Sequence, residues 1–173
     1  MNNDGALQQL EHIRDFQIAD LRKADRLAGA NFLVCVGCFN ATELLGGLEQ
    51  PVLLEDPDGK VAERLKRGIA VLGLPYQKYE QDLVALRHSM THSYRGQAKN
   101  YPHVDITNDR DPLVSMFPLG VQDLGQDEKL VVNVTAWTSD LENAWTSTLA
   151  RLRKDVGHLD EVRVALDQGS WLR

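Results

Sequence analysis

The longest stretch of the chain without a charged side chain runs over residues 27–42 and overlaps the sequence ANFLVCVGCFNATELL of residues 30–45. A helix that is apolar on nearly every side is buried inside a protein core. The stretch includes Asn31 and Asn40 and falls short of the roughly 18–20 apolar residues that span a bilayer. It therefore predicts a central helix over residues 30–45, ended by the glycine pair at Gly46 and Gly47, and no association with a membrane.

Apolar residues at helical spacing predict further helices around this central one. A Ser-x-x-Glu capping box at Ser139 and Glu142 is expected to begin a long fifth helix, with a short last helix near residues 159–166. The other predicted helices cover residues 6–26, 61–72 and 76–94.

The periodicity changes after Pro102, where branched residues and turn signals replace the helical pattern. HVDIT at residues 103–107, LVSMF at 113–117 and KLVVNVTAW at 129–137 are candidate strands. The fold class predicted is mainly α, a helical bundle of about five helices with a small antiparallel β-hairpin or sheet inserted at about residues 102–136. With 173 residues, 43% of them hydrophobic, the chain suits a single domain over residues 1–173.

Charge is unevenly distributed along the chain. The formal net charge is −6, but residues 60–99 carry eight Lys and Arg against three acidic residues, which is +5 and leaves −11 elsewhere. A polyanion such as RNA would therefore have to contact the middle of the chain. The N-terminal sequence lacks the basic start and apolar run of a signal peptide, so we expect a cytoplasmic protein.

Cys35 and Cys38 form a C-x-x-C pair, a spacing found in zinc sites and in dithiol redox sites. Here the pair lies in the middle of an apolar predicted helix, and no second cysteine pair exists to complete a zinc site. Free cysteine is among the most buried residue types. We therefore expect both thiols to be reduced, buried and free of metal.

The sequence LRHSMTHSYRG of residues 86–96 holds two of the five histidines at a spacing of four. His88 and His92 would share one face of the predicted helix over 76–94, as in a two-histidine metal site. The third ligand would have to come from elsewhere, from Glu43, His103 or Asp105. Because a histidine pair alone is a weak signal, we expect neither a metal nor a cofactor.

Arg87 and His92, followed by Tyr94, form an R-x4-H-x-Y pattern with the polar His88 directly after the arginine. Histidine and arginine suit RNA cleavage through the 2′-hydroxyl, which needs proton transfer near neutral pH and stabilisation of charge on phosphorus. On one helix Arg87 and His92 are about 140° apart, so they converge poorly within one chain. A two-fold dimer interface would bring the motifs of two chains together.

The pattern resembles the motif of the HEPN superfamily, and with the tyrosine it is similar to HepT-type toxins of HEPN–MNT toxin–antitoxin pairs. The resemblance implies a divergent HEPN-like helical bundle, a homodimer with its active site at the interface, and a metal-independent endoribonuclease of a toxin–antitoxin or defence system. It implies catalytic roles for Arg87 and His92, with His88 at the polar position. It also implies that Tyr94 is the residue modified by a nucleotidyltransferase antitoxin.

A second interpretation stays open. The chain would then be a non-catalytic dimeric bundle with a regulatory or ligand-binding role, in which Arg87 pairs with an acid such as Glu43 or Glu80 and the motif serves as scaffolding. The two interpretations differ in whether Arg87 and His92 line an open groove. Trp145 is expected in the core under both.

Overall fold

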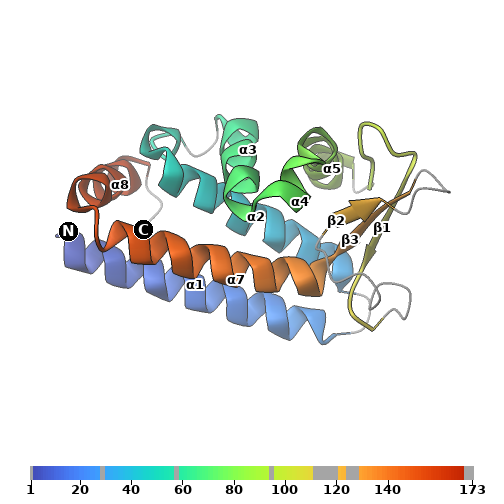
Figure 1. Cartoon of the computed structure of the whole chain (residues 1–173), viewed down its shortest axis with the longest axis horizontal. Coiled ribbons are helices and arrows are strands. Elements are labelled where there is room, and N and C mark those ends of the chain that lie inside the picture. The colour runs from blue at the N-terminus through green and yellow to red at the C-terminus, as the bar shows by residue number, and fades with distance from the viewer. Residues whose placement is uncertain are drawn as a thin grey trace.

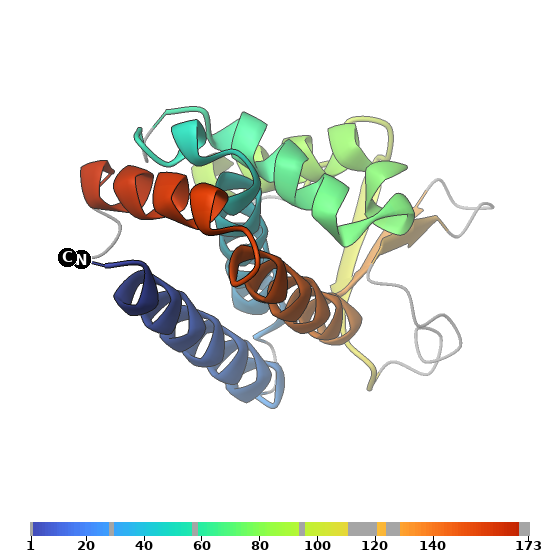
Figure 2. The same cartoon turned by 60° about the vertical axis from the view of Figure 1, so that its left-hand side comes forward.

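The structure of the chain, a computed structural model, describes residues 2–27, 30–56, 59–93, 96–110, 121–123 and 129–169. Three long helices lie side by side: α1 (Asn3–Asp25), α2 (Asn31–Glu49) and α7 (Val134–Leu152). One end is covered by the 3-10 helix η1 (Pro51–Leu53) and α8 (Val156–Gln168), while a sheet lies at the opposite end (Figure 1). The shorter helices α3 (Val61–Leu72), α4 (Leu74–Gln77) and α5 (Glu80–Ser93) lie across α2 (Figure 2). The predicted fold class, mainly α with a small sheet, is confirmed at this level.

Asparagine and aspartate side chains begin three of the helices. The Asn2 Oδ1 atom accepts from the Gly5 amide at 2.8 Å, and Asp155 Oδ1 accepts from the His158 amide at 3.0 Å. Asn133 Oδ1 accepts from the amides of Thr135 and Ala136, so α7 starts at Val134. The predicted start at a Ser139 capping box is wrong, because the strand KLVVN ends at a residue that caps the helix itself.

The prediction of a buried central helix is confirmed, since twelve residues of α2 are buried. Its predicted end at Gly46 is wrong, because α2 continues to Glu49. A Cβ atom on Gly46 would lie 1.8 Å from the Arg64 carbonyl oxygen, and one on Gly68 would lie 1.8 Å from the Thr42 carbonyl oxygen. The glycines therefore allow the backbones of α2 and α3 to touch, and they do not end the helix.

Helix α2 is also the one helix, in the described part of the chain, that is long and apolar enough to cross a bilayer by length and composition alone. However, 67% of its most apolar window is buried inside the structure. Phe39 packs edge-on against Trp137 of α7 at 5.0 Å between ring centroids, and Trp145 is fully buried as predicted. The apolar surface of α2 is thus mostly buried in the domain's own core.

The predicted single helix over residues 76–94 is two helices, and the described residues hold seven α-helices where about five were expected. Gly73 has a φ of 93°, which ends α3, and α4 follows at once with Pro75 in its first turn. Tyr76 turns toward α7, where its hydroxyl donates to Asp140 at 2.6 Å, whereas Tyr79 packs on Tyr101. The break between α4 and α5 lets two nearby tyrosines reach opposite partners.

The sheet has three strands in the order β1-β3-β2: β1 (His103–Thr107), β2 (Val121–Asp123) and β3 (Lys129–Asn133). β3 pairs antiparallel with β2, as Val121 opposite Val132 shows, but it pairs parallel with β1, with His103 opposite Lys129. The expectation of a purely antiparallel sheet is therefore wrong. Candidate strand 113–117 lies outside the described residues. The short last helix is confirmed as α8, with Leu159 and Leu166 buried.

Candidate functional site at the groove between α3 and α5

The motif that begins at Arg87 lies on the C-terminal half of α5. Leu83, Leu86 and Met90 form the buried face of this helix, which turns Arg87 and His88 outward. His88 is exposed, whereas the Arg87 side chain is 21% exposed. His92 lies on α5 one turn after His88, but its side chain and the whole of Tyr94 lie outside the described residues.

Arg87 is held by Glu43 from the central helix. The Arg87 Nε atom donates to Glu43 Oε1 at 2.7 Å, and Nη2 donates to Oε2 at 3.5 Å. A third bond runs from Nη1 to the Thr91 hydroxyl at 3.3 Å. The Glu43 side chain is only 9% exposed. The pair that the scaffold interpretation expected is therefore present, and it fixes the plane of the guanidinium.

Arg87 also borders an open groove of about 580 Å³ between α3 and α5. Three polar side chains face this groove, those of Gln81, Arg87 and His88, and the Lys99 ammonium bonds to Gln81 Oε1 at 2.6 Å. The remaining lining is apolar: Val61, Ala62, Leu65, Val84 and Ala85. Apolar walls with a few convergent polar groups are typical of sites that bind organic ligands.

No pattern in the sequence indicated this groove. Val61, Leu65, Val84 and Ala85 have the spacing of ordinary amphipathic helices, and nothing local distinguishes a residue that lines a groove from one that fills a core. The groove lies between α3 and α5, which both pack on α2 and contact each other. Only the tertiary arrangement shows that Arg87 and His88 lie at its edge.

One cation of the basic stretch over residues 60–99 does not reach the surface. Arg64 is 1% exposed, and its Nη1 atom donates to the carbonyl oxygens of Leu53, Asp56 and Gly59 at 2.8 to 3.0 Å. This side chain fixes the connection that follows η1. The surface charge available to a polyanion is thus smaller than the sequence count, and it rests on exposed residues such as Lys60, Lys66 and Lys99.

The ligands suggested for a metal site on the histidine pair are not gathered around it. Glu43 is engaged by Arg87, and Asp105 on β1 forms an ion pair with Lys129. Within the described ranges, no group of three His, Cys, Asp or Glu side chains is arranged to hold a metal ion. The geometry thus offers a guanidinium and an imidazole beside a groove, which can bind an anion and transfer a proton.

Cys35 and Cys38 are both fully buried and are not disulfide-bonded, which confirms the predicted burial. Burial raises the pKa of Cys35 well above its ordinary value, with a smaller contribution from neighbouring Cys38. Burial also raises the pKa of Cys38 to about 12, opposed by its contact with the Thr138 hydroxyl at 3.7 Å and assisted by Asp25. Neither thiol is suited to act as a nucleophile.

Native thiol labelling should therefore be slow. Because only the thiolate reacts, raising the Cys38 pKa from 9.0 to about 12 lowers its reactive fraction at pH 8 by about 10³-fold, before access is considered. Maleimide labelling followed by mass spectrometry, with and without denaturant, measures this. Rapid labelling of both cysteines in the native protein would contradict the packing of α2.

Comparison with known proteins identifies no relative: no family model, no curated protein and no solved structure matches this chain.

Proposed function

We propose that the chain is a divergent HEPN-like domain that acts on RNA as a homodimer, with Arg87 and His92 as its catalytic pair. The observation that carries the proposal is the position of Arg87, which is oriented by Glu43 and lies with His88 at the edge of an open groove. After its bonds to Glu43 and Thr91, two of the five guanidinium N–H groups remain for a phosphate oxygen.

In this mechanism His92 would accept the proton of the 2′-hydroxyl as its oxygen bonds to phosphorus, and the proton would pass to the 5′-oxygen that leaves when the P–O5′ bond breaks. Arg87 would stabilise the charge that develops on phosphorus. The two residues are five apart on α5, about 140° around the helix, so each groove would take Arg87 from one chain and His92 from its partner. Tyr94 would be a regulatory target of a nucleotidyltransferase antitoxin and would take no part in the chemistry.

The second candidate is a non-catalytic dimeric bundle with a regulatory or ligand-binding role. The specific observation in its favour is the same ion pair, because Glu43 offsets the charge with which Arg87 would attract a phosphate. The apolar walls of the groove would then hold the body of an uncharged ligand.

The deciding experiment is cleavage of single-stranded RNA by wild type and by His92→Ala, with and without EDTA. We expect cleavage that survives EDTA and falls by about 10²–10⁴-fold in His92→Ala, the usual cost of losing a general acid or base. Tyr94→Phe, purified in the same way, is the matched control and should retain most activity.

Each other outcome rejects part of the proposal. Activity that EDTA removes would indicate a metal site, and equal activity in His92→Ala would indicate a contaminating nuclease. Absence of cleavage by a folded, dimeric wild-type protein would favour the ligand-binding alternative. Light scattering that gave the monomer mass of 19.4 kDa would reject the shared site.

A further inference from the structure

A second groove lies on the other side of α3, between α2, α3 and α7. It has a volume of about 450 Å³. Its α3 residues, Arg67, Ala70 and Val71, lie on the face of that helix opposite to Val61 and Leu65, which border the groove beside Arg87. This groove shares no lining residue with the proposed RNA site and is therefore separate from it.

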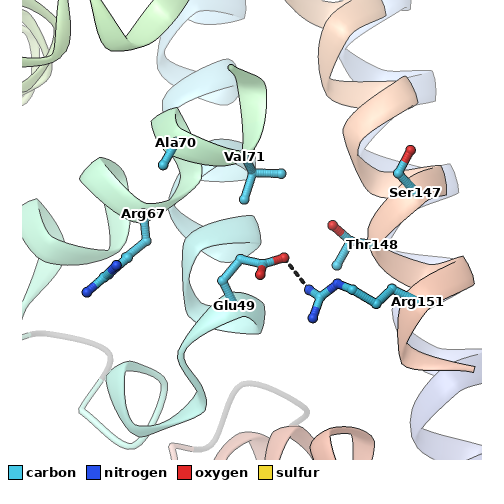
Figure 3. A pocket seen from close by; sticks show the side chains of 7 residues that line it. All are labelled: Glu49, Arg67, Ala70, Val71, Ser147, Thr148 and Arg151. Atoms are coloured by element: carbon cyan, nitrogen blue, oxygen red, sulfur yellow. Dashed lines mark hydrogen bonds and ion pairs between the residues drawn. The ribbon is translucent and has the colours of Figure 1, made fainter. Parts of the chain in front are cut away.

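The α7 wall of this groove carries two hydroxyl groups in consecutive positions. Ser147 is exposed, whereas Thr148 is 3% exposed. The Thr148 hydroxyl has no hydrogen-bond partner among the described residues, although the hydroxyls of Thr138 and Thr146 on the same helix both bond to backbone carbonyls. Figure 3 shows this hydroxyl on the side of α7 that faces Val71 and Glu49. The Thr148 hydroxyl is not one of the fully buried polar atoms that lack a partner, so it opens onto the groove, where a ligand can bond to it.

The groove also carries a net positive charge. Arg151 on α7 and Glu49 at the end of α2 form an ion pair across it, as the dashed line in Figure 3 marks. Arg67 lies at the rim on α3 with no ion pair or hydrogen bond among the described residues, and in Figure 3 its side chain points away from Arg151 and Thr148. Two guanidinium groups against one carboxylate give the lining a charge of +1.

Glu49 holds Arg151 through a single nitrogen, Nη2, which leaves the other guanidinium N–H groups for a second acceptor. Guanidinium and hydroxyl donors together match the oxygen atoms of a phosphate group. Ala70 and Val71 give the groove a small apolar wall, and Glu49 can accept hydrogen bonds from ligand hydroxyls. The volume is that of a small-molecule site.

We infer that this groove binds a phosphate group, carried by a small phosphate monoester or present as free phosphate. Thr148, Ser147 and Arg151 would contact the phosphate oxygens, and the Arg67 side chain, which points away from them in Figure 3, would turn inward to close over the phosphate. Glu49 would keep Arg151 in place and accept from hydroxyls of the ligand body.

The test is isothermal titration calorimetry, in which ribose 5-phosphate, inorganic phosphate and ribose are each titrated into the full chain at constant ionic strength. We expect ribose 5-phosphate or inorganic phosphate to bind and ribose not to bind. Tighter binding of ribose 5-phosphate identifies a monoester site, whereas equal binding of the two identifies a site for free phosphate. Both support the inference.

Two variants remove single donors without changing side-chain size much. Thr148→Val and Ser147→Ala should each weaken binding by about tenfold, as expected for a hydrogen bond to a charged group. Arg67→Gln should weaken it by a similar factor, whereas Lys66→Gln, the same charge change on the neighbouring residue, should have little effect. Circular dichroism checks that Thr148→Val is folded, and the exposed Ser147→Ala provides an independent test.

Absence of binding by wild type at about 1 mM phosphate ligand would overturn the inference. So would equal losses in Arg67→Gln and Lys66→Gln together with unchanged binding in Ser147→Ala, because the anion would then interact only with general surface charge.

Discussion

Gly68→Ala should destabilise the protein by more than about 4 kcal/mol, a large part of the roughly 5–15 kcal/mol by which native domains are stable. The Cβ atom would lie 1.8 Å from the Thr42 carbonyl oxygen and 2.8 Å from the Thr42 Cγ2 atom. The first of these contacts is with backbone, so no side-chain rotation relieves it. Helices α2 and α3 would have to separate, which would open the core around Leu45 and Leu65.

Gly46→Ala should behave in the same way, since its Cβ would meet the Arg64 carbonyl oxygen at 1.8 Å. Gly157→Ala in α8 is the matched control, because its nearest neighbour would be Asp155 Oδ1 at 3.7 Å, an ordinary contact. Alanine is a better helix former, so this variant should be unchanged or more stable by up to about 1 kcal/mol. Urea denaturation followed by circular dichroism measures all three. A Gly68→Ala protein as stable as wild type would mean that α2 and α3 do not cross at this point.

The same glycines show what the sequence could and could not predict. The uncharged stretch that starts at residue 27 correctly predicted a buried central helix, because burial follows from composition alone. The glycine pair at Gly46 and Gly47 was interpreted as a stop, which is its commonest local meaning. Its actual role depends on Gly68, which is distant in sequence, so no local pattern could distinguish the two.

The sheet was only partly predictable for a similar reason. HVDIT and KLVVN have strand composition, and both form strands. Local turn signals favour hairpins, and β2 with β3 is such a pair. The parallel pairing of β1 with β3 requires a crossover connection, which strand composition does not reveal. Asn133 belongs both to the end of β3 and to the cap of α7, so a strand pattern that continued into VTAW placed the helix start too late.

For the candidate site, the sequence indicated candidate residues but not their surroundings. Arg87 and Glu43 are 44 positions apart, and Glu43 was one of two acids considered as the partner of Arg87. The groove beside them depends on how α3 and α5 pack on α2, and the second groove depends on where α7 passes α3 (Figures 1 and 3). Both grooves are properties of how the helices pack together, and no single helix determines them.

Removing the Arg87 side chain should destabilise the protein by about 3 kcal/mol, because it leaves the Glu43 carboxylate buried without its partner. Replacing both residues, as Glu43→Leu with Arg87→Leu, should recover part of that loss, since an apolar pair carries no desolvation cost. A double-mutant cycle measured by urea denaturation gives the coupling between the two side chains. Coupling below about 0.5 kcal/mol would show that the pair contributes no more than an exposed surface pair does.

The same cycle separates the two functional candidates when RNA cleavage is measured beside stability. Glu43→Gln keeps one acceptor for Arg87 but removes the negative charge that offsets the guanidinium, so it changes the charge of the site with a smaller change in geometry. If Arg87 stabilises charge on phosphorus, Glu43→Gln should retain cleavage within about tenfold while Arg87→Ala loses it by about 10²–10³-fold, the cost of one donor to a developing oxyanion. If the pair is scaffolding, the effects of both variants on any bound ligand should scale with their losses of stability, and no folded variant should lose function by itself. Arg87→Ala that stays folded and dimeric but loses cleavage can arise only in the first case, because a scaffold acts through the fold that it supports.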